Sequence, residues 1–343
     1  MSATPGPVRA RATIRDVAAL GGVGIKTVSR VINNEANVSA PMRERVQHAV
    51  VALNFQPNQG AGALRRMDQR TRTLGLLLDA VDNPFSASVN RAVEAHASAR
   101  GTAVFAASFH DDPAVERSLI DAFTRRRVDG LILTTISDDH GYLAAEQEQG
   151  TPVVFIDRPP VGLVADAVLT DNDEAAATAT RHLLGHGHRR IAHLADELMI
   201  STSRERRRAF ADVMADAGAT PFHVDDLASE ASAEAATRAL LGLAEPPTAI
   251  FASQNLITVG ALRALHRLGL QHQVALVGFD DLLLADLVKP AVTVIAQDPQ
   301  QIGTSAAVRL FARLDGDTSP ASTLVVPSQL VVRGSGEIAA PAS

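Results

Sequence analysis

The 343-residue chain contains no cysteine, which excludes disulfides, zinc–thiolate sites and thiol catalysis and fits a reducing compartment. It also lacks any uncharged apolar stretch approaching the ~18 residues that a membrane span needs. No apolar run follows the N-terminal arginines, because Arg15 and Asp16 interrupt it, so we expect no signal peptide. Together these absences predict a soluble, cytoplasmic protein without a membrane partner.

Hydrophobic residues make up 46% of the chain and charged residues 20%, so the protein can bury sizeable cores. Its length suggests two or three domains. The net charge of −6 is unevenly distributed: residues 1–70 carry ten Lys and Arg against four Asp and Glu, a balance of +6 that leaves −12 for the rest. A basic head on an acidic body indicates a polyanion bound at one end, although charge alone also permits a merely solvated basic surface.

The region 13–55 has the pattern of three short helices and no strand. Thr13 can cap a first helix, which the glycines of 21–24 end. A second helix follows as far as Asn33, and Pro41 lies in the first turn of a third, where its missing N–H is tolerated. The apolar residues at helical spacing are Ile14, Val17 and Ala18, then Val28, Val31 and Ile32, then Met42, Val46, Ala49, Val50 and Leu53.

Two short helices joined by a glycine turn leave the outer face of the second helix free to enter a DNA major groove. That face offers Ile25, Lys26, Ser29 and Arg30. Lysine or arginine can bond O6 and N7 of guanine, and isoleucine can contact a thymine methyl group. Helical hairpins are common, so this pattern alone leaves DNA binding and plain helix packing both open.

From residue 72 onward, short apolar runs alternate with longer helical patterns. This alternation predicts parallel sheets covered by helices on both faces, and the length favours two doubly wound subdomains. Such sheets bind ligands at the carboxyl ends of their strands, so a cleft between the two is the expected pocket. The runs include Leu74–Leu78, Ala103–Ala107, Leu131–Leu133, Val153–Ile156, Ile191–Leu194, Ala249–Ala252 and Ala275–Phe279.

Residues 13–33 match, at most positions, the signature "T-I-x-D-V-A-x-x-A-G-V-S-x-x-T-V-S-R-V-L-N" of the lactose-repressor (LacI/GalR) family of transcription regulators. Further family motifs occur in order at Asn83–Ser86, His182–Ile191, Ser203–Phe210, Val277–Asp281 and Gln297–Asp298. The chain therefore resembles this family from residue 13 to about 336. The resemblance implies a repressor that binds pseudo-palindromic double-stranded operator DNA as a homodimer, under the control of a small effector.

By this resemblance Ile25, Lys26 and Arg30 read bases, while Thr27, Ser29 and Asn33 support phosphate contacts and helix docking. Gly21 and Gly24 depart from the Ala and Ser of the family, and Gly24 lacks a hydroxyl that could cap the second helix, a loss of roughly 0.5–2 kcal/mol. The whole implied DNA-binding set is Thr13, Ile14, Ile25, Lys26, Thr27, Ser29, Arg30, Asn33, Asn58, Ala61 and Leu64.

The segment 54–66 resembles the hinge of the family, which becomes a helix when two subunits meet in a minor groove. Leu64 would then be the wedge at the central base step, and Ala61 the close helix–helix contact. A flexible linker is the alternative, and Gly60 and Gly62 favour it, because each costs about 1 kcal/mol in a helix.

The resemblance also implies an effector gripped by Arg206 and Asp280, which face each other across the cleft, with Phe85, Asp157 and Gln254 nearby. A guanidinium fork and a carboxylate both bond well to vicinal hydroxyls. Because the stretch between Phe222 and Phe251 lacks the stacking ring that some sugar-binding relatives have, we expect a small sugar, polyol or sugar acid.

Two other functions share some of these features: a sugar-binding transport protein, which has a similar core, and a nucleotide-linked enzyme. The head and the missing signal peptide argue against the first, and we expect no enzyme activity and no cofactor. A metal site at His182, His186 and His188 is weighed against a helix-end role, which is favoured because no carboxylate lies close by in sequence.

The expected domains are a disordered segment 1–12, the head 13–57, the hinge 58–71 and a core 72–338. The two subdomains of the core are expected to span about 72–167 with 298–324, and about 168–297 with 325–338.

Overall fold

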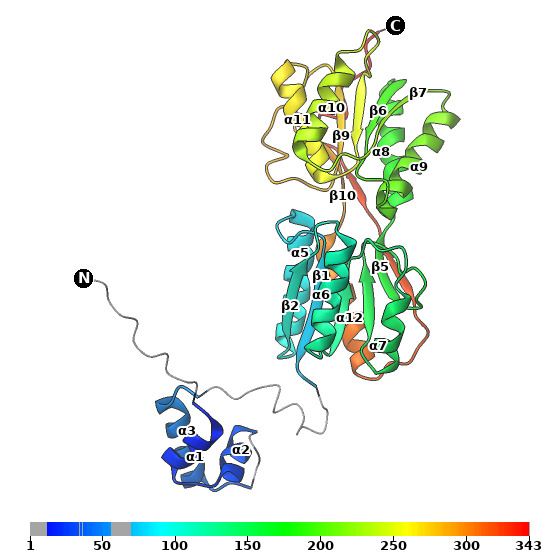
Figure 1. Cartoon of the computed structure of the whole chain (residues 1–343). Helices are drawn as coiled ribbons and strands as arrows, with labels where there is room; N and C mark the ends of the chain where they lie inside the picture. Colours follow the sequence, from blue (N-terminus) through cyan, green and yellow to red (C-terminus); the bar gives the residue numbers. More distant parts are fainter. Residues whose placement is uncertain (1–11, 34, 36, 56–69, 343) are drawn as a thin grey trace, which may run out of the picture. The chain divides into compact units, whose positions relative to one another are not determined.

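The computed structural model describes residues 12–33, 35, 37–55 and 70–342. The N-terminal segment, the hinge residues Asn58, Ala61 and Leu64, and the two glycines beside them lie outside the described residues. The chain divides into two compact units, Met1–Thr71 and Arg72–Ser343, which are a helical head and an α/β core (Figure 1).

The head contains the helices α1 (Ile14–Gly21), α2 (Ile25–Ile32) and α3 (Ala40–Ala52). Thr13 begins α1 through a capping box, since its side chain accepts from the Asp16 N–H while the Asp16 carboxylate accepts from the Thr13 N–H. Gly22 ends α1 in the left-handed region at φ 62°, which glycine adopts without a steric penalty. The apolar stripes then meet in one core of Val17, Ala18, Val28, Val31, Val46 and Ala49. Met42, expected in the third stripe, is instead exposed.

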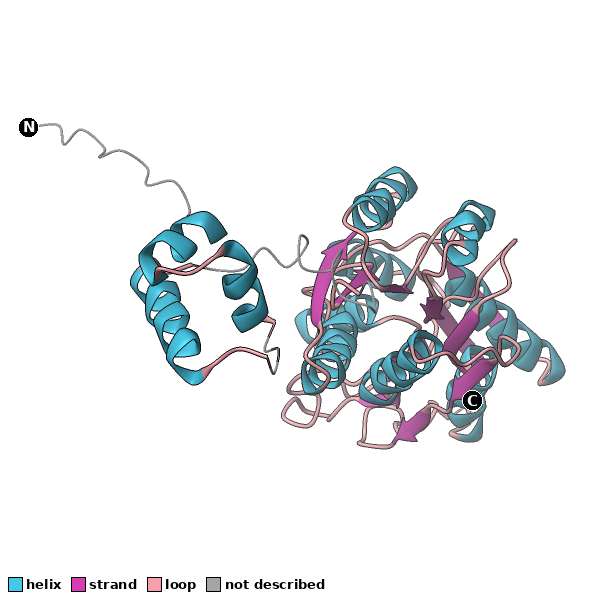
Figure 2. Cartoon of the chain, turned by 90° about the horizontal axis from the view of Figure 1, so that it is seen from below, coloured by secondary structure: helices cyan, strands magenta, loops and turns pink. Residues whose placement is uncertain are grey.

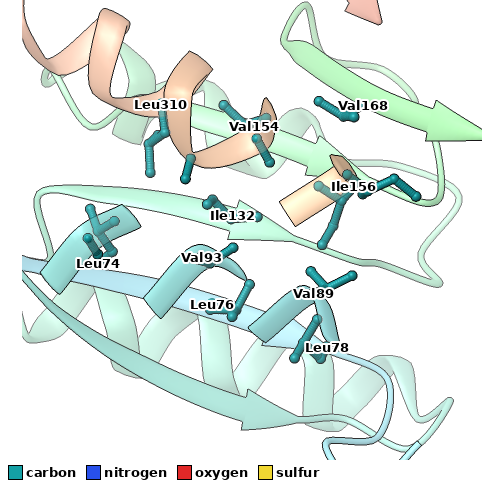
Figure 3. Packing of buried hydrophobic residues seen from close by; sticks show 14 of the residues in the cluster. Leu74, Leu76, Leu78, Val89, Val93, Ile132, Val154, Ile156, Val168 and Leu310 are labelled. Carbon is teal, nitrogen blue, oxygen red and sulfur yellow. The ribbon is translucent and has the colours of Figure 1, made fainter. Parts of the chain in front are cut away.

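The first sheet of the core has the strand order β11-β5-β4-β3-β1-β2, with all neighbours parallel. One face packs against α5 and α12 in the cluster of Figure 3, and the other face against α6. Its strands are β1 (Thr73–Leu78), β2 (Ala103–Ser108), β3 (Gly130–Leu133), β4 (Val153–Ile156), β5 (Asp166–Thr170) and β11 (Thr323–Val326). Its helices are α5 (Pro84–Ala99), α6 (Pro113–Arg125), the short η1 (Gly141–Leu143) and α7 (Ala144–Glu148), and α12 (Pro299–Leu314).

The second sheet has the order β12-β10-β9-β8-β6-β7, parallel except for the edge pair β10–β12. Helices α8 and α9 cover one face, and α10 and α11 the other. Its strands are β6 (Arg190–Leu194), β7 (Thr220–Val224), β8 (Ala249–Ala252), β9 (Ala275–Phe279), β10 (Thr293–Ala296) and β12 (Gln329–Val331). Its helices are α8 (Asn172–Gly185), α9 (Ser201–Asp216), α10 (Glu230–Leu241) and α11 (Asn255–Leu268).

The chain crosses between the two sheets after β5, after β10 and after β11. Strands β5 and β11 continue to Thr170 and Val326, so two crossings lie a few residues later than the approximate boundaries given above. Seen from below, the strands of the core lie between helices (Figure 2). The expected fold class, a small helix-turn-helix head with two doubly wound parallel-sheet subdomains, is confirmed. Within the described residues, no helix combines the length and the apolar character required to cross a membrane.

Candidate functional site

The helix α2 presents one polar and basic face away from the core of the head. Val28 and Val31 are buried on its inner side. On the outer side Lys26 and Arg30 are exposed, and Ile25 has 45% of its surface accessible. The first turn of α2 has no side-chain cap, because Gly24 occupies the N-cap position, so its first N–H groups are available to an anion.

The other expected DNA-binding residues of the head differ in exposure. Thr27 and Ser29 are half-buried along α2, and Asn33 is the exposed C-cap of that helix. Ile14 is half-buried and packs against the head core, so its side chain stabilises the fold. Arg30 lies 3.7 Å from the carboxylate of Glu35, with both side chains about half exposed, and such a pair contributes little and leaves Arg30 available.

In the core, Arg206 of α9 is 6% exposed and firmly held. Its Nε donates to Oδ1 of Asn172 at 2.8 Å, and its Nη1 donates to the carbonyl of Ser253 at 2.9 Å. The guanidinium carbon lies 3.7 Å from the ring centroid of Phe279, in a cation–π contact. Burial lowers the pKa of Arg206, and the charges of Asp280 and Asp157 oppose this effect.

Asp280 follows β9 directly and is the carboxylate with the strongest influence on Arg206. It accepts a hydrogen bond from Nε2 of Gln297 at 2.7 Å, and the hydroxyl of Thr170 donates to the same amide. Burial raises the pKa of Asp280, while Arg206 lowers it. The chain thus forms a connected polar group at the carboxyl ends of β5, β9 and β10, where a doubly wound fold binds ligands.

One expectation about this group is wrong. Arg206 and Asp280 do not come from opposite walls of the cleft, because α9 and β9 both belong to the second sheet. The residue from the first sheet is Asp157, which follows β4 and acts electrostatically on both of them. Asp157 is therefore the member of this group that the first subdomain supplies. The segments that follow β4 and β9 are remote in sequence, so the spacing of residues within one motif could not reveal that both belong to this group.

The two remaining candidates have local roles. The Oε1 atom of Gln254 accepts from the N–H of Ile257 at 3.1 Å and so caps α11. The ring of Phe85 packs against the core of the first sheet, and its N–H donates to Asn83. The structure therefore brings Arg206, Asp157 and Asp280 together, and uses Gln254 and Phe85 in capping and packing.

A pair of amides that the sequence analysis missed joins the two subdomains. Asn83, the N-cap of α5, and Asn255, the first residue of α11, each donate to the carbonyl oxygen of the other, at 3.3 and 2.9 Å. They lie 172 residues apart, so their spacing gives no signal. Their place at the N-terminal ends of helices that follow β1 and β8 is the signal that could have found them.

A cavity of about 580 Å³ lies between the two subdomains. It is not lined by Arg206 or Asp280, although Arg204 and Arg158, which do line it, lie close in sequence to Arg206 and Asp157. Its lining residues are Pro113, Thr135, Ile136, Ser137, Asp138, Arg158, Pro159 and Val161 of the first subdomain and Met199, Ile200, Ser201 and Arg204 of the second.

Acidic residues surround Arg158 beside this cavity. Arg158 is 7% exposed and contacts Asp111 at 3.4 Å. Burial, aided by Asp111, raises the pKa of Asp79 to about 6. Burial also raises the pKa of Asp196, on the second sheet, to about 6. Asp79 and Asp196 follow β1 and β6 closely, a position that marks ligand-facing groups in parallel sheets.

The histidines near the end of α8 have ordinary partners. His182 contacts the carboxylate of Glu337 at 2.6 Å, and His186 contacts the carbonyl of His182. His188 contacts Thr248 and the carbonyl of Ile338. No carboxylate lies near these histidines in the sequence, but in the structure Glu337 of the C-terminal segment contacts His182.

A helix-turn-helix head joined to two doubly wound sheets with a polar cleft defines a class, the DNA-binding transcription regulators with a ligand-binding core. Residues 13–58 match "Bacterial regulatory proteins, lacI family", and residues 71–332 match "Periplasmic binding proteins and sugar binding domain of LacI family". The chain belongs to the LacI family of bacterial transcription regulators.

Relatives and solved structures agree with this membership. The HTH-type transcriptional regulator PtxS of Pseudomonas aeruginosa is 34% identical over 340 residues, which cover 96% of this chain and 97% of that protein. The lac repressor dimer bound to operator and the anti-inducer ONPF is similar with a TM-score of 0.82 and 26% identity, over 95% of this chain and 99% of that one. The complex of the transcriptional regulator CelR with cellobiose gives a TM-score of 0.68 and 31% identity, over 95% and 100%.

Proposed function

We propose that the protein is a cytoplasmic repressor that binds a pseudo-palindromic operator as a homodimer and has no enzyme activity. The observation that carries this proposal is the exposed face of α2, where Ile25, Lys26 and Arg30 stand on a helix fixed by Val28 and Val31. Two such faces related by a two-fold axis read two half-sites of one duplex. The lac repressor structure, a dimer on its operator, supports this arrangement.

Operator binding by Arg30 is tested against a second arginine of the head. We expect Arg30→Ala to weaken binding to the selected operator by about 1–3 kcal/mol and binding to random duplex far less, because a base contact discriminates. Arg45→Ala removes an exposed cation from α3 and serves as the control. We expect it to weaken binding to the operator and to random duplex by the same factor. Fluorescence anisotropy at several salt concentrations measures both, and binding weakens steeply with salt as counterions are released. If Arg30→Ala weakens binding to both duplexes equally, Arg30 contacts only phosphate and does not read a base.

We further propose that the core binds a small polyhydroxy effector, a sugar, polyol or sugar acid, next to Arg206, Asp157 and Asp280. A buried guanidinium and two carboxylates supply donors and acceptors for vicinal hydroxyls, and the CelR complex with cellobiose shows that a relative takes a sugar. Because Asp157 comes from the first subdomain and the other two from the second, a ligand that touches all three favours the closed cleft. A ligand shifts DNA affinity only by its preference for one state.

Effector binding is tested by calorimetric titration of a sugar, polyol and sugar-acid panel, paired with operator binding. Arg206→Ala and Asp157→Asn are expected to abolish the effector response while basal operator binding stays close to that of the parent. Asp157→Asn is the variant expected to stay folded, because it preserves the size of a side chain that is partly exposed to solvent. An undiminished response in both variants would refute the site, and silence of the whole panel would refute the effector class.

A further inference from the structure

A cluster of possible metal ligands, made of residues not discussed above, lies at the edge of the second sheet. His193 on β6 and His223 on the edge strand β7 are directly paired in the parallel register. Asp225 lies two residues beyond His223, and residues two apart on a strand share a face. One ligand atom from each of these three residues lies within 4.8 Å of the other two.

The imidazole of His193 is fully buried, and it has no polar partner among the described residues. Its ring stacks on Phe210 of α9 at 4.9 Å and lies 5.3 Å from Phe251 of β8. Neither of its nitrogens has a hydrogen bond, and Nδ1 of His223, also buried, lacks one as well. A buried polar atom without a partner costs about 1–3 kcal/mol, so a ligand bound by these two neighbouring imidazoles would relieve part of that cost.

We propose that His193, His223 and Asp225 form a binding site for a transition-metal dication of the zinc type. Two imidazoles and one carboxylate are ligands that Zn²⁺ prefers over the all-oxygen sets of Ca²⁺ and Mg²⁺. Three protein ligands leave the fourth tetrahedral position for water.

The site requires a small inward movement. Bonds of about 2.0–2.1 Å place tetrahedral ligands roughly 3.3–3.5 Å apart, less than the present spread. His193 is fixed by the aromatic rings around it, whereas His223 on the edge strand β7 and Asp225 just beyond its end are half-buried and can approach it. Arg207 now donates from Nε to both oxygens of Asp225, at 2.9 and 3.0 Å. Metal binding takes one of these oxygens and leaves the other to orient the carboxylate.

The test is calorimetric titration of the full-length protein with Zn²⁺ in a non-chelating buffer. We expect one Zn²⁺ per chain, a higher thermal midpoint with zinc, and at least about tenfold weaker binding in His223→Gln and in Asp225→Asn. The matched control is the double variant His182→Gln with His186→Gln, which removes the other close histidine pair, whose rings are 4.6 Å apart. It is expected to keep the affinity of the parent.

Co²⁺ in place of Zn²⁺ reports the geometry, because a tetrahedral site gives visible absorption bands that His223→Gln should lose. Circular dichroism without metal verifies that each variant is folded, and Asp225, beyond the end of β7, is the substitution least able to disturb the core. The proposal is overturned by a parent that binds no Zn²⁺, by binding that survives both ligand substitutions, or by binding that is lost in the His182 and His186 control. The site lies outside the groups proposed for DNA and effector, so its failure leaves that function untouched.

Discussion

At the scale of single residues, the least expected group is the carboxylate of Glu116, which is fully buried in the first subdomain. It accepts from the backbone N–H groups of Ile136 and Ser137, from the Ser137 hydroxyl and from the hydroxyl of Tyr142. Ile136 and Ser137 line the cavity between the subdomains. Glu116 therefore fixes one wall of that cavity.

Glu116→Leu is expected to lower the free energy of unfolding by about 2–5 kcal/mol, because two backbone N–H groups lose their acceptor. Glu116→Gln is the matched control and should stay close to the parent: its carbonyl can accept from both N–H groups, while its amide donates to the two hydroxyls, which can also accept. Urea unfolding of both variants measures this. Equal losses in the two would show that charge, and not acceptor geometry, holds the loop.

Residue-level prediction from the sequence succeeds where a motif carries the information and fails where contacts are distant. Arg206 and Asp280 come from two family motifs and influence each other electrostatically, while their role in effector binding stays a prediction. The contacts of Glu116 and of the pair Asn83–Asn255 do not follow from spacing within a motif, because their partners lie 20 to 172 residues away. Only the register and the packing of the sheets bring such residues together.

At the scale of elements, the turn before α2 contains two glycines with opposite requirements. Gly24 caps α2 with φ −72°, and a Cβ there would meet nothing within 4 Å. Gly22 ends α1 at φ +62°, where an L side chain is strained. Substitutions at the two positions are therefore expected to change the stability of the head in opposite directions.

Gly24→Ser adds a hydroxyl that can accept from an N–H of the first turn of α2, which is worth a few tenths of a kcal/mol relative to glycine. We expect hydrogen exchange of the α2 amides in the full chain to slow by up to about twofold. Gly22→Ala, the control, adds a methyl group at a left-handed position, at a cost of about 1–2 kcal/mol, and should speed exchange by about fivefold or more. Faster exchange in Gly24→Ser would mean that the free N-terminus of α2 is not a source of instability.

Apolar runs marked the buried strands and also the exposed edge strand β2. The runs Val153–Ile156, Ala249–Ala252 and Ala275–Phe279 coincide with β4, β8 and β9, whose residues are all buried. The edge strand β7 contains a proline and a histidine and has no fully buried residue, so no apolar run marks it. Since β7 supplies His223, the candidate metal site stayed invisible for the same reason.

At the scale of the whole core, the cleft gathers carboxylates from both subdomains in a partly desolvated space. Asp79 comes from the first sheet and Asp196 from the second, and the charges of Asp111 and Arg158 act on both. Burial raises the pKa of each to about 6, against an ordinary value of 3.8. Between about pH 4 and 6 the folded protein therefore binds more protons at these two groups than the unfolded chain does.

Above about pH 6 both carboxylates are charged in the folded protein, and their burial lowers the free energy of unfolding by its full amount. As the pH falls from about 6 to 4 they become protonated, and this destabilising effect is lost. Asp196→Asn removes the buried charge and is expected to raise the free energy of unfolding at pH 7 by about 1–2 kcal/mol, after allowance for partial exposure. At pH 4 the advantage should nearly vanish, because the parent carboxyl is then protonated in the folded state and only beginning to ionise in the unfolded chain. Asp79→Asn, on the opposite subdomain, should behave in the same way.

Urea unfolding of the parent and both variants at pH 4, 5, 6 and 7 measures the difference in the free energy of unfolding directly, and in this difference the contributions of the other carboxylates cancel. A difference that stays constant from pH 4 to 7 would mean that neither group is desolvated in the closed cleft.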